Sequence, residues 1–185
     1  MPRHLGQLES AQPIYITGNY FDIGVGSTTR GNVTGVADRV VVAPFIAPKT
    51  IAVDRAAIDV TTNVAGADAR ICIYDGDGTG GVPNTRLYDS AELDCSTATG
   101  IQEVTLSFTF DAGRLYWVGV HNESTAALRA IVAADCRPIG VIPTTSGACY
   151  TCYRVASTFG TDSPDPFGTP ILLNANVPQV RFRIA

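Results

Sequence analysis

Apolar residues recur at every second position through much of the chain, and this period predicts β-strands. Successive side chains of a strand point to opposite faces, so residues two apart share one face. The clearest case is "IQEVTLSFTF" at residues 101–110, whose expected inward set is Val104, Leu106, Phe108 and Phe110. Hydroxyl residues alternate with this set, which predicts a strand that is buried on one side only.

Shorter segments with the same alternation predict further strands. In "ARICIYD", Ile71 and Ile73 share one face and Cys72 lies on the other. The segment "AALRAIVAA" suits a strand or a short helix, and the neighbouring strands favour a strand. Other strands are expected at "DRVVVAPFI", "LYWVGVH" and "VPQVRFRIA", the last being a closing strand at residues 178–184.

The segment 51–62 changes phase part-way along. Its apolar positions fall on odd numbers up to Val53 and on even numbers from Ala56. One extra residue in a strand shifts every later side chain to the opposite face. We therefore predict a β-bulge near Asp54 or Arg55.

Turn residues separate these segments at intervals of about eight to twelve residues, which is typical of sandwiches. We predict an all-β fold over residues 38–185, an antiparallel two-sheet β-sandwich with jelly-roll-like connections. Residues 1–37 lack a sustained period and are predicted to form an extended N-terminal arm that contacts neighbouring subunits. Residues 137–176 are predicted as a loop-rich insertion, in which "TFGTDSPDPFGTP" forms an exposed loop or a contact surface.

Composition narrows the choice of partners. The chain has 185 residues and a net charge of −4, with 13 scattered Lys and Arg residues, so no nucleic acid is expected as a partner. No segment reaches the roughly 18 to 20 apolar residues that span a bilayer, and the N-terminus has no apolar core of signal-peptide length. We therefore expect synthesis in a cytoplasm and no membrane partner.

The glycine-rich segment 73–90, "IYDGDGTGGVPNTRLYDS", resembles part of a calcium loop. Counted from Asp75, Asp77 falls at position 3, where a helix-flanked calcium loop has a ligand. Gly80 falls at position 6, where such a loop turns sharply on a glycine. Position 12, which should be a bidentate carboxylate, is Arg86. Asp75 and Asp77 stay calcium candidates, but a long turn between strands explains the glycines better.

The five cysteines leave two interpretations open. The C-x-x-C pair in "ACYTCY" has no second pair and no histidine cluster to complete a zinc site, so no metal is predicted. At least one disulfide or a set of reduced packing thiols remains, and the odd number leaves one thiol free or paired to another subunit. The disulfide candidates are Cys72, Cys95, Cys136, Cys149 and Cys152.

Catalytic motifs are missing from the sequence. The only histidines are His4, in the predicted arm, and His121, at the end of a strand. No nucleophile elbow, zinc-binding helix motif or phosphate-binding loop occurs. A dyad of Cys152 with His121 has no support from any motif. We predict no enzyme activity, no catalytic residue and no cofactor.

The order of segments over residues 38–134 resembles a β-sandwich module of tailed-bacteriophage virion proteins, such as head-fibre, decoration, neck and tail-fibre components. The similar pieces are "DRAAIDVT", "ARICIYD", "LYDSAELDCSTATG" and "AGRLYWVGV". These pieces belong to the scaffold, so the resemblance implies fold and broad role but no chemistry. Cys72 and Cys95 depart from it, because small or hydroxyl residues are usual there. Oxidation of the cysteines after lysis would suit a virion protein.

The resemblance implies a structural component of the virion, as a capsid decoration, head fibre, collar or tail protein. Its expected partners are its own copies, as a homo-oligomer and by the resemblance a trimer, and capsid, portal-neck or tail proteins. The alternative is an adhesion module that binds carbohydrate or another host-surface ligand through aromatic side chains. We prefer a core or subunit-interface role for the aromatic candidates, which are Tyr88, Tyr150, Tyr153, Phe159 and Phe167.

Overall fold

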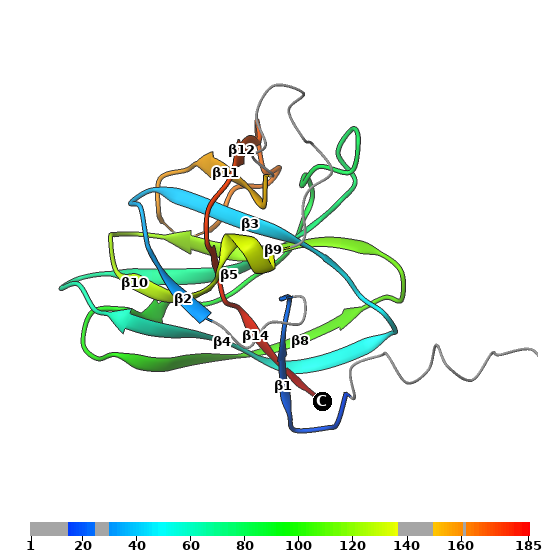
Figure 1. Ribbon diagram of the computed structural model, residues 1–185, viewed down its shortest axis with the longest axis horizontal. Coiled ribbons are helices and arrows are strands. Elements are labelled where there is room, and N and C mark those ends of the chain that lie inside the picture. Colours follow the sequence, from blue (N-terminus) through cyan, green and yellow to red (C-terminus); the bar gives the residue numbers. More distant parts are fainter. Residues whose placement is uncertain (1–14, 25–29, 137–149, 161) are drawn as a thin grey trace, which may run out of the picture.

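Two antiparallel β-sheets packed against each other make up almost all of the regular structure (Figure 1). The computed structural model describes residues 15–24, 30–136, 150–160 and 162–185. Outside the strands, these residues contain a short 3-10 helix at Ala133–Asp135, and no helix in the described ranges is long and apolar enough to cross a membrane. The prediction of an all-β, two-sheet sandwich is confirmed.

The first sheet is built around its longest strand, β4. The strand β8 pairs along one side of β4, while β14 and then β10 pair along the other. The order is β1-β14-β4-β10-β13, with β2 also on β10. The strands are β1 (Tyr20–Asp22), β2 (Arg30–Thr34), β4 (Ile51–Thr62), β8 (Gly100–Phe110), β10 (Ala127–Ile131), β13 (Val177–Pro178) and β14 (Arg181–Ile184).

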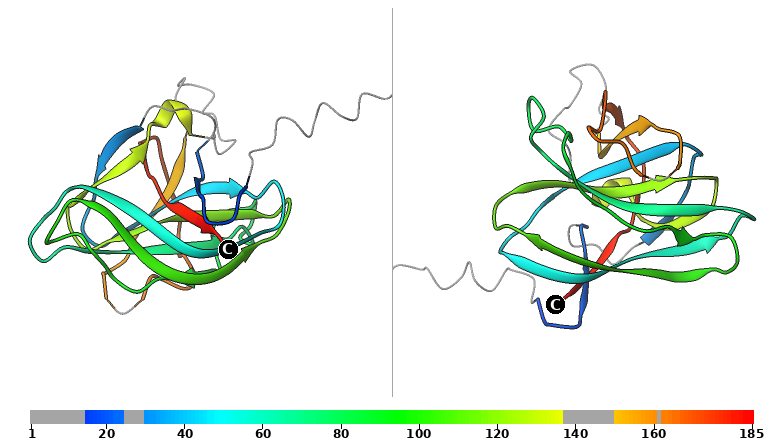
Figure 2. Two further views of the ribbon diagram at one scale, coloured as in Figure 1. Left: turned by 90° about the horizontal axis from the view of Figure 1, so that it is seen from below. Right: turned by 180° about the vertical axis from the view of Figure 1, so that it is seen from behind.

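The second sheet lies in a separate layer (Figure 2). Its order is β12-β11-β3-β9-β5-β6, with β7 also on β5, so that β9 lies between β3 and β5. The strands are β3 (Arg39–Ile46), β5 (Asp68–Asp75), β6 (Arg86–Asp89), β7 (Leu93–Asp94), β9 (Leu115–Asn122), β11 (Cys152–Ala156) and β12 (Ile171–Leu173).

The main core fills the space between the two sheets, and the inward residues that the alternation predicts in β5 and β8 lie in it or pack against it. Ile71 and Ile73 of β5 lie in this core, while Cys72 faces the opposite side of the sheet. The closing strand β14 returns into the first sheet, next to β4. Consecutive residues Arg183 and Ile184 of β14 pair with Arg55 and Val53 of β4, so Asp54 is an extra residue in β4 and the predicted β-bulge is confirmed.

A second, smaller core covers the face of the second sheet that points away from the first. It consists of Val40, Val42, Cys72, Tyr74, Trp117, Tyr153 and Phe167. The strands supply all of these side chains except Phe167, which comes from residues 157–160 and 162–170, called here the covering segment. The orange covering segment lies on this side of the sheet in the right-hand view of Figure 2.

The segment "TFGTDSPDPFGTP", predicted to be an exposed loop or a contact surface, has two residues that are buried within the described protein. Ser163 and Phe167 are 2% and 0% exposed. The physical reason is that β3, β5 and β9 carry apolar side chains on both faces, as strands do when both faces of a sheet are covered. The outer face therefore needs apolar cover, and a proline-rich segment without regular pairing supplies it.

Two stretches of the predicted N-terminal arm are strands of the first sheet. Tyr20–Asp22 pairs with Arg181–Arg183 of β14, and Arg30–Thr34 pairs with Ala127–Ile131 of β10. The described part of the arm is therefore attached to the sandwich by ladder hydrogen bonds. Its contact with neighbouring subunits stays a prediction.

Candidate functional site

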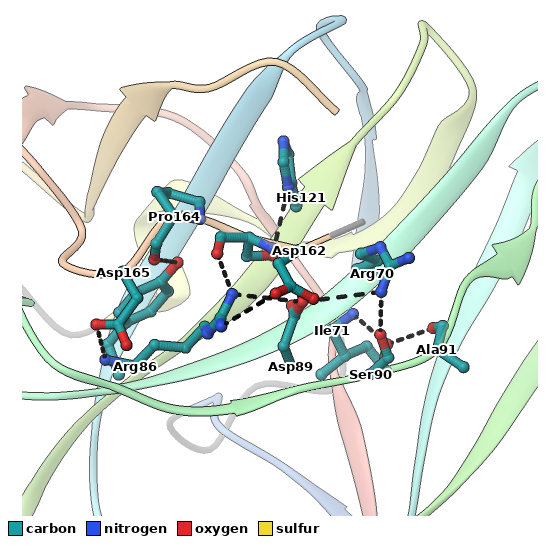
Figure 3. Close-up of polar contacts among 12 residues, drawn as sticks. Arg70, Ile71, Arg86, Asp89, Ser90, Ala91, His121, Asp162, Pro164 and Asp165 are labelled. Carbon is teal, nitrogen blue, oxygen red and sulfur yellow. Dashed lines mark hydrogen bonds and ion pairs between the residues drawn. The ribbon is translucent and has the colours of Figure 1, made fainter. Parts of the chain in front are cut away.

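A cluster of charged and polar side chains lies on the outer face of the second sheet, beneath the covering segment (Figure 3). It comprises Arg70, Arg86, Asp89, His121 and Ser163 and is called here the Asp89 cluster. Register brings it together: Arg70 of β5 is the partner of His121 on β9, while β6, which carries Arg86 and Asp89, pairs on the other side of β5.

Asp89 is the centre of this cluster. Its Oδ2 atom lies 3.8 Å from Nη1 of Arg70 and 3.7 Å from Nη1 of Arg86. The side chains are only 10%, 12% and 20% exposed, so the three charges are held largely out of water. Figure 3 shows the two arginines reaching Asp89 from opposite sides. Each guanidinium also meets a second, more exposed carboxylate, Glu92 at 2.8 Å from Arg70 and Asp162 at 3.5 Å from Arg86. Asp89 is therefore the buried carboxylate that the two arginines share.

The covering segment is fixed to this cluster through its backbone. The Ser163 N–H donates a 2.9 Å hydrogen bond to Oδ2 of Asp89, and the Arg86 guanidinium donates to the Ser163 carbonyl. The Tyr74 hydroxyl donates to the Pro164 carbonyl at 2.8 Å. Buried backbone groups without partners are costly, so these bonds allow an irregular segment to lie flat on a sheet.

Ser163 and His121 form a serine–histidine pair, which resembles the nucleophile and base of a hydrolase. Ser163 Oγ lies 3.3 Å from His121 Nδ1, and His121 Nε2 lies 2.9 Å from the Ser157 carbonyl oxygen. Burial lowers the pKa of His121, so the neutral ring donates from Nε2 and accepts at Nδ1. Both side chains are at most 2% exposed. The pair satisfies its own hydrogen bonds and holds the covering segment.

The structure does not bring together the dyad considered from the sequence. Cys152 lies in the core between the sheets, whereas His121 faces the covering segment. Their strands belong to the same sheet, but the side chains point to opposite faces. His4 lies outside the described residues.

The four cysteines in the described ranges are all free thiols. Burial raises the pKa of Cys95 to about 12 and that of Cys136 and Cys152 to about 11. Burial also raises the pKa of Cys72, which is 0% exposed. Protonated thiols are poor nucleophiles. Cys149 lies outside the described residues, so pairings that involve it stay a prediction.

The two calcium candidates face separate protein partners. The Arg114 guanidinium forms an ion pair with Asp75. The Asp77 carboxylate accepts hydrogen bonds from the Thr85 backbone N–H at 3.0 Å and from its hydroxyl at 2.5 Å. Among the residues with described positions, no group of three or more acidic, histidine or cysteine side chains lies close enough to hold a metal.

The five aromatic candidates occupy different environments. Tyr153 and Phe167 are buried in the second core, where the Phe167 ring meets the Tyr74 ring edge-on at 4.9 Å. Tyr88, Tyr150 and Phe159 are partly exposed, and the Phe159 ring lies 5.0 Å from the His121 ring. No exposed row of aromatic rings results from this arrangement among the described residues.

The first sheet ends on one side in an open edge, β8. Within the described chain this strand of 11 residues pairs with β4 alone. Ile101, near its start, is 51% exposed. The Tyr88 hydroxyl lies 3.4 Å from the Thr105 carbonyl, but no neighbouring strand in the described ranges completes the edge.

The fold and these two features define an all-β sandwich with a buried ionic cluster and an open strand edge. No protein-family model matches the chain, and no curated protein sequence matches it.

Sequence reasoning missed the Asp89 cluster. Arg70 interrupts the apolar run "ARICIY", and Asp89 follows the apolar pair "LY" at residues 87–88. A charged residue at such a position needs a partner when it is buried. The signal therefore exists in the sequence, but it does not identify Arg86 or the distant Ser163 as the partners.

Proposed function

We propose that the protein is a structural component of a tailed-bacteriophage virion, on the head, collar or tail, which works by assembling with its own copies and with other virion proteins. The observation that supports assembly is the open edge of β8. An edge strand presents unpaired N–H and C=O groups that pair readily with another chain. The resemblance of residues 38–134 to phage sandwich modules supplies the virion context.

The composition of β8 favours pairing. Soluble monomers protect such edges with lysine, proline or very short strands, and "GIQEVTLSFTF" contains neither lysine nor proline. Its single charged residue is Glu103. The register shift opposite Asp54 divides the strand, and the Thr105 carbonyl already accepts a hydrogen bond from the Tyr88 hydroxyl. The part from Gly100 to Val104, which carries the exposed Ile101, is therefore the template for a partner.

Lysine substitutions at outward positions of the edge test this proposal. We expect the wild type to sediment as an oligomer and the double variant Ile101→Lys/Ser107→Lys to sediment as a monomer with an unchanged melting temperature. Ile171→Lys is the matched control, because Ile171 is 49% exposed at the opposite end of the other sheet. A monomeric wild type, or a double variant that keeps the oligomer, would count against assembly through β8.

The virion context has its own test. Mass spectrometry of purified particles should find the chain if the host of this gene produces a tailed phage, and the neighbouring genes should encode a portal, terminase or tail proteins. Adhesion is the second candidate function. Because Tyr153 and Phe167 are buried, a glycan-binding face would depend on Tyr88, Tyr150 and Phe159, and a glycan array tests it directly.

A further inference from the structure

Two arginines lie side by side on the inner face of the second sheet, at one end of the sandwich. Arg154 of β11 is the register partner of Val41 on β3, and Arg39 of β3 is the partner of Ala156 on β11. Val41 packs against the core between the sheets. Since residues two apart share a face, Arg39 and Arg154 point to the same side as Val41, toward the first sheet.

Neither arginine has an acidic partner in the described part of the chain. Eight other arginines form ion pairs there, but Arg39 and Arg154 form none. The Nε atom of Arg154 is buried without a hydrogen bond. Burial and the nearby Arg154 charge lower the pKa of Arg39. Two adjacent, partly buried cations without a counter-charge repel each other and destabilise the fold.

A cavity of about 240 Å³ opens directly beside Arg39. It lies between β2, β10 and β13 of the first sheet and β3, β9 and β12 of the second. Thr34, Arg39, Asn122 and Asn176 are its polar lining, and its walls are otherwise mostly apolar: Val33, Val36, Val41, Leu128, Leu173 and Pro178. Small-molecule sites usually enclose about 300–1,000 Å³ and combine apolar walls with a few polar groups. This cavity suits a ligand at or below the lower end of that range.

We propose that this cavity binds a small organic carboxylate with a short apolar chain. The planar Arg39 guanidinium matches a carboxylate with two parallel N–H donors, and the Arg154 charge adds to the attraction. The apolar chain lies against Val33 and Leu128. Inorganic phosphate fits less well, because its remaining oxygens would face apolar walls. The ligand supplies the counter-charge that the described chain does not.

Three probes separate the contributions of charge and apolar contact. Hexanoate carries both groups, 1-hexanol carries only the apolar chain, and inorganic phosphate carries only the charge. We expect hexanoate to bind the full-length protein saturably in isothermal titration calorimetry and to raise its melting temperature. Binding should weaken as salt is added. Hexanol and phosphate should each bind at least about tenfold more weakly.

Arg39→Gln tests the residue that carries the proposal. We expect it to weaken hexanoate binding by at least about tenfold and to leave the ligand-free melting temperature equal or higher, because it removes the repulsion from Arg154. Arg129→Gln is the matched control. Arg129 follows Leu128 in β10, so its side chain points away from the cavity, and it forms an ion pair with Asp59. It should bind hexanoate like the wild type.

Several results would overturn the proposal. Equal binding of hexanoate and hexanol would make the cavity a purely apolar site, and equal binding of phosphate would make it an unselective anion site. A large drop in the ligand-free melting temperature of Arg39→Gln would show that Arg39 already has a stabilising partner. Glu9 is the one acidic residue outside the described ranges, and a similar drop in Glu9→Gln would identify that partner. Absence of saturable hexanoate binding would also refute the site.

Discussion

The backbone N–H of Ser163 donates a 2.9 Å hydrogen bond to Oδ2 of Asp89, a residue 74 positions earlier in the chain. This bond joins the covering segment to the short strand β6. The same carboxylate oxygen lies within 3.8 Å of Arg70 and 3.7 Å of Arg86, so charge compensation and the attachment of the segment share one atom. The ionic cluster and the second core should therefore form together.

Replacing Asp89 with Asn should strongly destabilise the protein. The change removes the buried carboxylate that two mostly buried guanidinium groups share, while Arg70 keeps Glu92 and Arg86 keeps Asp162 as partners. The loss should therefore lie at the lower end of the roughly 3–5 kcal/mol that breaking a buried pair costs. We expect a loss of about 3 kcal/mol in the free energy of unfolding, measured by urea denaturation. Asp162→Asn is the control: Asp162 lies 3.5 Å from Arg86, but its side chain is 66% exposed, so its loss should cost less than about 1 kcal/mol. Equal losses would contradict a central role for Asp89.

Truncating Phe167 should open the second core. Its side chain is 0% exposed, and Phe→Ala substitutions in cores cost about 3–5 kcal/mol. Trp117, the single tryptophan, lies in the same core, so Phe167→Ala should also shift its fluorescence to longer wavelength. Ile171→Ala, at a site that is 49% exposed, should change neither property. Unchanged fluorescence in Phe167→Ala would show that the Phe167 side chain is not needed to exclude water from Trp117.

The sequence predicts the core between the sheets but not the second core, for a physical reason. Alternation identifies strands such as β8, where Leu106 and Phe110 are buried and the intervening residues are polar. In β9, Trp117 and Val118 point to opposite faces and both are buried. A run that is apolar on both faces shows that both need cover, but it does not say what covers them.

The features of the first and second sheets also differ in whether local sequence can predict them. The phase change near Asp54 predicts the bulge, because it depends on neighbours along one strand. The Asp89 cluster depends on contacts between β5, β6 and the covering segment, and the Ser163–Asp89 bond spans 74 residues. Local patterns cannot predict such a pairing without the topology. The adjacency of Arg39 and Arg154 likewise requires the β3–β11 register.

Acidification should lower the free energy of unfolding of the wild type, because the unfolded chain binds a proton at His121 more readily than the native protein does. Burial lowers the folded-state pKa of His121 below its ordinary value of 6.5. Between these two pKa values the unfolded chain binds a proton that the native chain does not, so stability rises with pH there and falls as the solution is acidified. The slope from this residue is at most about 1.4 kcal/mol per pH unit, and it ends below the folded-state pKa.

This effect is measured by urea denaturation of the wild type and of His121→Gln between pH 7.5 and 5.5. That range covers about one pH unit on each side of the unfolded-state pKa. The wild type should lose more stability than the variant over the same range. The other charged groups around the ring are Asp89, Arg70 and Asp38, which both proteins retain, so the difference isolates His121. Identical pH dependence would mean that the ring titrates normally in the native state.

The buried thiols of Cys72, Cys95 and Cys152 should react only when the protein unfolds, and the partly buried thiol of Cys136 should react slowly in the native protein. Burial holds the pKa of Cys95 at about 12 and that of Cys136 and Cys152 at about 11, so each is protonated near neutral pH. A Cys149→Ser variant removes the thiol outside the described ranges. Its native form should react slowly with a thiol reagent, and under denaturing, non-reducing conditions all four remaining thiols should react. If only two thiols react, the other two form a disulfide, and the disulfide interpretation of the cysteines would hold.

A methyl group at Gly119 should separate two central strands. Gly119 lies on β9 between Trp117 and His121, opposite Val42 of β3. A Cβ atom there would lie 1.8 Å from the Val41 carbonyl oxygen and 2.7 Å from Val42 Cα. Both are backbone atoms, so no side-chain rotation relieves the clash, and β3 itself must move. Because β3 and β9 pair over eight residues, Gly119→Ala should cost at least about 3 kcal/mol, the upper end of overpacking effects.

Gly160→Ala is the matched control for this substitution. A Cβ atom at Gly160 meets no atom within 4 Å, so the control should unfold at the same urea concentration as the wild type. Gly119→Ala should unfold at a much lower concentration or accumulate as insoluble protein. A soluble Gly119→Ala variant with wild-type stability would mean that β3 and β9 tolerate a wider separation than their ladder implies. The second core and the Asp89 cluster, which rest on this sheet, would then also be more adaptable than their close packing indicates.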